Sequence, residues 1–215
     1  MIAHLPSIEP ADRAEHEAAV DVLANAFADD PMVREAVSRA SSPALARRRI
    51  FEASTRTALA QGGALLVAKH ESLIVGAAIV VGPNERRVRG SVQRATAGLR
   101  FLRLLPLLGL RGLALLNDAD LASRRLAPRA PHHVLVAVGV SSAGRGQGLG
   151  RALVDAAFAR AVAHSSSEGL RLETESPKNV ELYARWGFDA LGRVEVHPVT
   201  VHVMYRSARE ARKDT

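Results

Sequence analysis

The stretch "VLVAVGVSSAGRGQGLGRALVDAAFARA", residues 134 to 161, joins a β-branched run to a glycine-rich loop and an alanine-rich segment. The run at 132–140 is almost continuously apolar and β-branched, which predicts a buried strand. The periodicity of 149–163 predicts a helix. The loop between them contains four glycines within seven residues: Gly144, Gly146, Gly148 and Gly150.

A bare backbone just before a helix collects unpaired N–H groups at the positive end of the helix dipole, which favours phosphate binding. A turn without a ligand is the alternative, but such a turn needs only one or two glycines. The spacing excludes a Walker A loop, because Gly144 leads to Leu149 and Gly146 leads to Arg151. It also excludes the dinucleotide fingerprint, which requires glycine where Leu149 stands.

The rest of the chain is patterned as alternating helices and strands. We expect helices at 12–28 (with Asp12 as the cap), 31–39 and 43–60, a hairpin at 64–69 and 73–81, a helical insertion at 84–131, a strand at 169–176, a short helix at 179–187, and one or two closing strands at 194–206. The strand, loop, helix and strand from 132 to 176 form a βαβ unit, whose two strands should be parallel neighbours.

Composition limits the class of protein. At 215 residues and 47% hydrophobic content, we expect one domain spanning 1–215. Cysteine is absent, which excludes disulfides, thiolate metal sites and a Cys nucleophile and favours a reducing cytoplasm. The amino terminus does not resemble a secretory signal, and arginines and a proline interrupt 99–116 too often for a membrane span. No histidine spacing indicates a metal site; we expect a structural or solvated role for His132, His133, His197 and His202.

The net charge of +7 favours anionic partners. Nucleic-acid binding normally adds clustered basic residues and stacking aromatics, whereas aromatics make up 4% of this chain and its arginines are scattered. We therefore expect no nucleic-acid partner, although a basic nucleic-acid-binding module stays open as an alternative.

The loop reads R-x-x-G-x-G from Arg145 to Gly150, directly after the strand. In this the chain resembles the GCN5-related N-acetyltransferase (GNAT) family, and "LETESPKNVELYARWGF" at 172–188 resembles the family's second signature. With "AFADDP" at 26–31, these stretches are similar to puromycin N-acetyltransferase and its relatives. Two departures are Ser142, where relatives commonly have proline, and the absence of Glu from the strand before the loop.

The resemblance implies an α/β GNAT fold, with a mixed central sheet of about six to seven strands flanked by helices and a helical insertion between the third and fourth strands. It also implies that acetyl-CoA is the cosubstrate, its pyrophosphate held by the loop and its pantetheine arm paired with the strand edge at 138–140, where a backbone N–H polarises the thioester. The cofactor-binding residues are then Val138, Gly139, Val140, Arg145, Gly146, Gln147, Gly148, Leu149, Gly150, Arg151 and Asn179.

The implied reaction is transfer of the acetyl group to a primary amine of a small molecule, by direct attack in a ternary complex. Tyr183 is the expected acid for the leaving thiolate, since the family has a Tyr in this helix. Glu173 is the expected base, and Asp29 and Asp30 are further candidates near the acceptor.

The acceptor pocket should be built from the first helices, the 84–131 insertion and the closing strands. The positive charge favours a small amine with an apolar portion over a polycation, and detoxification or antibiotic resistance is the expected use. A non-catalytic acyl-CoA sensor is the alternative. A homodimer stays open, and we expect no membrane partner.

Overall fold

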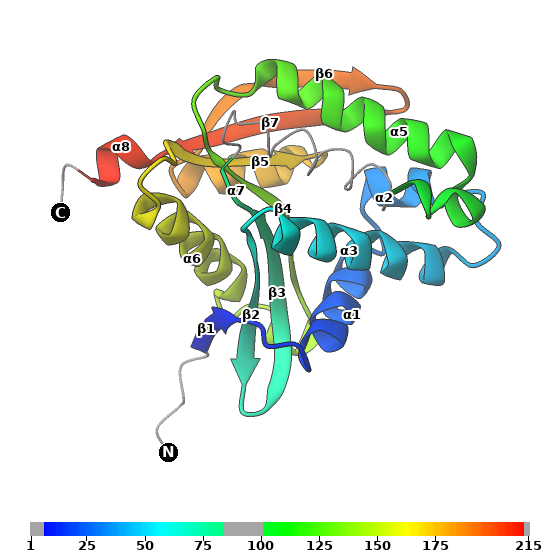
Figure 1. Ribbon diagram of the computed structural model, residues 1–215, viewed down its shortest axis with the longest axis horizontal. Coiled ribbons are helices and arrows are strands. Elements are labelled where there is room, and N and C mark those ends of the chain that lie inside the picture. The colour runs from blue at the N-terminus through cyan, green and yellow to red at the C-terminus, as the bar shows by residue number, and fades with distance from the viewer. Residues whose placement is uncertain (1–6, 84–100, 213–215) are drawn as a thin grey trace.

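A seven-stranded mixed sheet organises residues 7–83 and 101–212, the parts of the chain that the computed structural model describes. The strands are β1 (Ser7–Pro10), β2 (Ala64–His70), β3 (Leu73–Val81), β4 (His133–Val140), β5 (Gly169–Thr174), β6 (Asp189–Val196) and β7 (Val199–Ser207). Their order is β1-β2-β3-β4-β5-β7-β6 (Figure 1). All neighbouring pairs are antiparallel except β4 and β5, so the predicted mixed sheet is confirmed.

β4 and β5 are the parallel neighbours that the βαβ pattern predicts. They pair over only three positions: His133 with Leu170, Val134 with Arg171 and Leu135 with Leu172. β4 then continues to Val140 and β5 to Thr174 without further pairing, while β4 remains paired with β3 on its other side. The two strands therefore separate toward their carboxyl ends, and among the described strands none covers this edge of β4.

A β-bulge at Val136 accompanies the separation. Leu135 lies opposite Val80 and Ala137 opposite Ile79, so Val136 has no partner on β3. The extra residue changes the phase of the strand, since Leu135 packs with one core cluster and Ala137 with the cluster on the opposite face. Val136 is left 43% exposed where the strands part.

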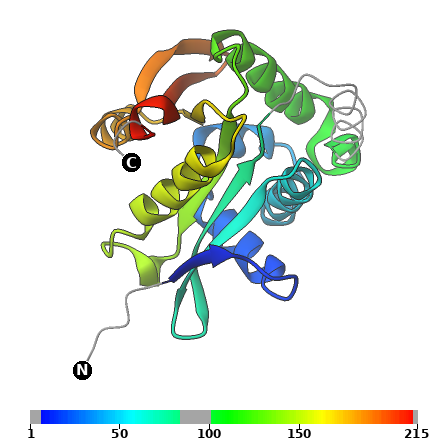
Figure 2. The same ribbon diagram turned by 60° about the vertical axis from the view of Figure 1, so that its left-hand side comes forward.

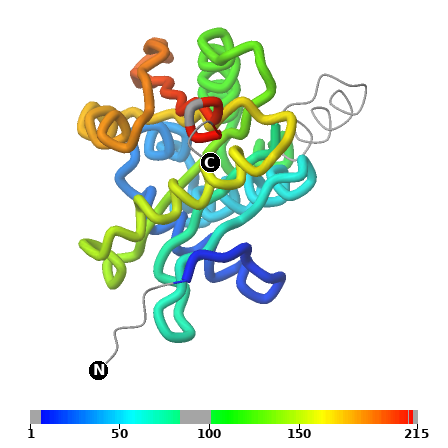
Figure 3. Tube along the Cα trace, turned by 90° about the vertical axis from the view of Figure 1, so that its left-hand side faces the viewer, coloured from blue at the N-terminus to red at the C-terminus, as the bar shows by residue number. Residues whose placement is uncertain are grey.

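Helices cover both faces of the sheet. They are α1 (His16–Ala26), α2 (Pro31–Ala36), α3 (Pro43–Ala60), α5 (Leu105–Leu126), α6 (Leu149–Ala163), α7 (Pro177–Arg185) and α8 (Ala208–Ala211), with a 3₁₀ turn η1 (Ser142–Gly144). Figure 2 shows α3 and α6 on opposite sides of the central strands, and Figure 3 shows α6 crossing in front of the sheet. α1 lies on the same face as α3.

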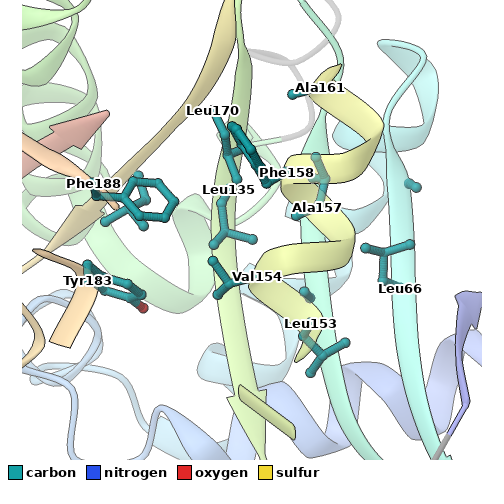
Figure 4. Close-up of a cluster of buried hydrophobic side chains, with 14 of the residues drawn as sticks. Leu66, Leu135, Leu153, Val154, Ala157, Phe158, Ala161, Leu170, Tyr183 and Phe188 are labelled. Atoms are coloured by element: carbon teal, nitrogen blue, oxygen red, sulfur yellow. The ribbon is translucent and has the colours of Figure 1, made fainter. Parts of the chain in front are cut away.

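The largest core cluster lies beneath α6. Its buried side chains recur at helical spacing and pack on Leu135 of β4 and Leu170 of β5 (Figure 4): Leu153, Val154, Ala157, Phe158 and Ala161. Burial of each large side chain stabilises the fold by roughly 1.5–3 kcal/mol. This packing fixes the start of α6, and hence the glycine loop, against the end of β4.

α5 and α2 cover the end of the sheet formed by β6 and β7, in a cluster that includes Met32, Leu115 and Val201. Gly109 interrupts α5 with φ 65° and ψ 177°, so the described part of the insertion consists of two helical segments. The remainder of the predicted insertion, 84–100, lies outside the described residues. No helix of the described ranges has the length and apolarity needed to cross a membrane.

Several element boundaries differ from those predicted. α1 begins at His16 with Glu15 as N-cap, although Asp12 and Glu15 do exchange side-chain to backbone hydrogen bonds of 3.0 and 2.9 Å in the preceding turn. α2 ends at Ala36 instead of reaching residue 39, because the following residues form a turn in which the Ser38 hydroxyl donates to the Glu35 carbonyl.

Strand boundaries differ as well. β1 was not predicted, since four residues that include Pro10 carry little strand signal; it adds to the edge of β2, where a proline is tolerated. β5 ends at Thr174, two residues before the predicted end. The closing segment forms two strands, and the first begins at Asp189.

Candidate active site

The glycine loop follows β4 and is shaped by two left-handed residues. Gly146 has φ 78° and Gly148 has φ 74°, a region that residues with a Cβ avoid. Gly144 is glycine for a different reason, since a Cβ there would meet Val140 and Leu149 at 2.8 and 2.9 Å. The space around Gly146 and Gly148 is open, because an added Cβ would have no neighbour within 4 Å.

The loop and the first turn of α6 present free backbone donors. Within the described chain, the N–H groups of 146–151 have no hydrogen-bond acceptor, and the first N–H to find one belongs to Ala152, which donates to the Gly148 carbonyl at 3.0 Å. These groups lie at the positive end of a 15-residue helix. Such an arrangement is typical of a phosphate site.

The side chains of the loop leave these donors uncovered. Gln147 folds back, with its Nε2 donating to the Ala143 carbonyl at 3.0 Å. Arg145 is exposed, and Arg151 makes one long ion pair, 3.4 Å from its Nε to Asp155. Both guanidinium groups are therefore accessible to an anion bound at the loop.

The unpaired edge of β4 ends at this loop, and Val138, Gly139 and Val140 lie on it. Gly139 is required by packing, because a Cβ would come within 2.7 Å of the Ala26 Cβ on α1. α1 can therefore lie close against the strand without covering its edge. The free edge has the hydrogen-bonding groups that a linear amide chain needs in order to add as another strand.

Tyr183 and Asn179 lie on α7, on the α6 side of the sheet. The ring of Tyr183 is 8% exposed and packs edge-on against Trp186 and Phe188, with ring centroids 5.5 and 5.8 Å away. Its hydroxyl is directed toward β4, on the side of Val154 (Figure 4). Burial, with the negative charge of Glu175, raises the pKa of Tyr183 to about 12. The phenol therefore keeps its proton throughout the neutral range.

The side chain of Asn179 binds the protein itself. Its Nδ2 donates to Thr174 Oγ1 at 3.2 Å, and its backbone N–H donates to the Ser176 carbonyl at 3.0 Å. In the structure, these contacts hold the start of α7. These bonds connect α7, and with it Tyr183, to the end of β5.

Glu173, the expected base, is held by a buried guanidinium. Arg171 is the preceding residue on the same face of β5, its side chain is 5% exposed, and its Nη1 lies 2.5 Å from Glu173 Oε1. Burial raises the pKa of Glu173, and the charge of Arg171 opposes that shift. Because the carboxylate is engaged by this ion pair, Glu173 is a poor acceptor for a substrate proton.

Glu175, which sequence reasoning missed, forms a carboxyl pair with Asp30 close by. Glu175 directly follows β5, and its side chain bonds that of Asp30, the N-cap of α2, whose Oδ1 also accepts from the Val33 N–H at 2.9 Å. Burial, and then the negative charge of Asp30, raise the pKa of Glu175 to about 8. Burial also raises the pKa of Asp30, while its hydrogen bonds lower it. The pair thus shares a proton near neutral pH, with Glu175 as its holder.

The other candidates lie apart from this pair or are engaged elsewhere. Asp29 is exposed at the end of the turn before α2. His133 is buried, with its Nδ1 2.9 Å from Ser167 Oγ, and burial lowers its pKa to about 4. The described residues include no cluster of His, Cys, Asp and Glu that could hold a metal ion.

A shallow cavity of about 570 Å³ lies between α2, α5 and the β6–β7 turn, the elements from which the acceptor pocket was expected. Its lining combines charged side chains of both signs with apolar ones, including Glu35, Asp118, Arg125, Leu115 and Val196. None of Tyr183, Glu173, Glu175 or the loop lines it, so the cavity is separate from the groups described above.

Comparison with known proteins places these features in a family. The model of the acetyltransferase (GNAT) family matches residues 31–188. A Corynebacterium glutamicum structure described as a histone acetyltransferase and related acetyltransferase is 28% identical, with a TM-score of 0.70 over 94% of this chain and 95% of that one.

Two other solved structures share the fold at lower identity. An agmatine N-acetyltransferase is 18% identical, with a TM-score of 0.66, over 94% of this chain and 99% of its own. A Drosophila melanogaster polyamine N-acetyltransferase that forms N-acetylagmatine is 17% identical, with a TM-score of 0.60 and the same coverage.

Proposed function

Because the chain belongs to the GNAT family of acetyltransferases, we propose that it transfers the acetyl group of acetyl-CoA to the primary amine of a small molecule. The observation that carries the proposal is the meeting of three features where β4 and β5 separate: a free strand edge, a loop of unpaired N–H groups, and groups suited to giving and taking a proton.

The orphaned donors fit acetyl-CoA. The N–H groups of 146–151 would hold its pyrophosphate, with Arg145 and Arg151 adding charge, and the edge at 138–140 would pair with its amide-containing arm. Acetyl-CoA supplies an activated acyl group as a thioester, so the protein must align it with the amine and manage the protons.

Tyr183 serves as the acid in this proposal. Its phenol makes no hydrogen bond to another described residue and stays protonated at neutral pH, so it is available to donate to a developing thiolate. The aromatic contacts with Trp186 and Phe188 fix the ring, and Asn179 fixes the helix that carries it.

Glu175, with Asp30, serves as the base in place of Glu173. An alkylamine arrives mainly as an ammonium ion at pH 7 and must lose a proton before its nitrogen can attack. A carboxylate whose proton affinity is raised by burial and by a second carboxyl accepts that proton more readily than one paired with Arg171. With a pKa of about 8, Glu175 is ionised in about one molecule in ten at pH 7, and this ionised fraction accepts the proton. The shared negative charge of the pair also attracts the incoming cation.

For the acceptor, the neighbours that act on agmatine and polyamines support a small amine. The motif likeness to puromycin N-acetyltransferase adds aminonucleoside antibiotics to the candidates, and detoxification or resistance as the use. The cavity does not contain the reacting groups, but the non-reacting part of a long acceptor would extend into it along α2, from the N-cap Asp30 to Glu35 in the cavity lining.

The test is release of CoA thiol from acetyl-CoA with agmatine, spermidine, tryptamine and puromycin as acceptors. We expect at least one amine to drive release, and Tyr183→Phe to lower kcat for it by about 100-fold. Tyr205→Phe, the other tyrosine in the chain, is the matched control and should retain the rate. Silence with all four amines, or an unchanged rate in Tyr183→Phe, would count against the proposal.

A further inference from the structure

The ion pair between Arg171 and Glu173 is a buried charge pair to which the proposed reaction gives no part. Arg171 and Glu173 lie on the same face of β5, and Glu175 follows directly after the end of the strand. The pair is close, 2.5 Å between Arg171 Nη1 and Glu173 Oε1, and its side chains are 5% and 27% exposed. The chain thus carries two paired charges immediately before Glu175.

Stability explains this pair poorly. The desolvation of two buried charges offsets much of their attraction, and an apolar pair of similar volume often serves as well. The pair is also incompletely satisfied, because Arg171 Nε has no hydrogen-bond partner among the described residues. Apolar neighbours were available on this face, where β7 places Val203 opposite Glu173.

The pair acts on the ionisation of Glu175 mainly through the negative charge of Glu173. Glu173 is two residues from Glu175, about 6.6 Å along an extended chain, and its negative charge favours the protonated form of Glu175. The guanidinium of Arg171 lies against the Glu173 carboxylate and offsets part of that charge, and burial weakens the screening of both charges. Glu173 therefore opposes ionisation of Glu175, and Arg171 limits that effect.

We propose that Arg171 and Glu173 are positioning residues that act through Glu175, setting the pH at which the Glu175–Asp30 pair takes a proton from the acceptor amine. The inference rests on the proposed function of that pair. The other groups facing Glu175 are Asp30 from α2 and Tyr183 from α7, while Asp120 of α5 faces Glu173. The charges of Arg171 and Glu173 add to these, and both can be removed without changing Glu175 or Asp30.

Carboxyl ¹³C NMR titration of protein labelled at its glutamate side chains measures this directly and needs no acceptor. The Glu175 resonance is assigned by its loss in Glu175→Gln. We expect a midpoint near 8 in the wild type. Glu173→Gln leaves a lone cation and should give the lowest midpoint, about one pH unit or more below the wild type. The double variant Arg171→Gln with Glu173→Gln removes both charges and should fall between them.

The order wild type, double variant, Glu173→Gln would establish the inference, and equal midpoints in all three would overturn it. The double variant carries no lone buried charge, so it also controls for misfolding of Glu173→Gln. A failure of the proposed function would be distinguishable from a failure of this inference. If no amine is acetylated, or if Glu175→Gln keeps the wild-type pH profile, then Glu175 is not the base, whatever its resonance shows.

Discussion

The two faces of β5 perform different tasks. On one face, Leu170 and Leu172 are 0% and 1% exposed and pack beneath α6. On the other, Arg171 and Glu173 form a buried ion pair, and Glu175 follows at the end of the strand beside Asp30. Strand alternation alone separates these sets, so one six-residue segment both anchors the core and carries charge to the opening beside β4.

Burial of a side chain therefore has opposite energetic consequences on the two faces of β5. Removing a leucine from water stabilises the fold by roughly 1.5–3 kcal/mol. Removing a carboxyl from water costs stability unless it stays protonated, and that is what gives Glu175 its proton affinity. Substitutions on the two faces should therefore affect different properties.

The largest effect is expected from Glu175→Gln. Loss of the base should lower kcat/KM for the accepted amine by about 100-fold or more at pH 7, with the fold retained because glutamine resembles the protonated acid. Steady-state kinetics with thermal unfolding as the fold check measures this. Glu181→Gln, an exposed glutamate on α7, is the control.

Leu172→Ala makes the comparison from the other face. It should lower the free energy of unfolding by about 2–5 kcal/mol and leave the pH profile of kcat/KM in place. A shifted pH profile in Leu172→Ala, or a full rate in Glu175→Gln, would show that the two faces are not separate in function.

A smaller effect is expected in the pH dependence of stability. The carboxyl of Glu175 has a pKa of about 8 when folded and about 4.3 when unfolded, so between these values the folded state holds a proton that the unfolded state lacks. The stability that it contributes is complete below the lower value and is lost as the pH rises through the higher one.

Urea unfolding from pH 5 to 9 tests the sign of this effect. Glu175→Gln should gain stability relative to the wild type as the pH rises, by about 4 kcal/mol across the range. Stability curves that stay parallel would mean that Glu175 is not buried as a neutral acid.

The parts of the fold that could be predicted are those determined by local sequence patterns. The helix at 149–163 and the parallel strands on either side follow from periodicity and from the loop between them, and both were confirmed. The left-handed Gly146 and Gly148 agree with the glycine spacing. β1 was not predicted, because it is defined by its pairing with β2, a strand that is distant from it in the sequence.

Less of the candidate site than of the fold could be predicted from the sequence, because the site also depends on long-range contacts. Asp30 was recognised as a candidate, and the spacing of Glu173 and Glu175 can be read from "LETES". The difference in proton affinity between these two glutamates cannot be read from the sequence, because it depends on α2 placing Asp30 against Glu175 and on Arg171 engaging Glu173. These contacts are long-range or set by side-chain choice, which spacing along the chain does not encode.

The most direct test of the account is the thermal unfolding of the protein with acetyl-CoA, ATP or NAD. A ligand at 100 times its Kd adds about 2.7 kcal/mol to stability, a shift of roughly 5–10 °C for a chain of this length. We predict that shift for acetyl-CoA alone, and its loss in Gly150→Val, because an added Cβ at Gly150 meets only Val140 Cγ2, at 3.9 Å, while the larger side chain would obstruct a phosphate bound at the loop. A shift with ATP or NAD and none with acetyl-CoA would contradict the account.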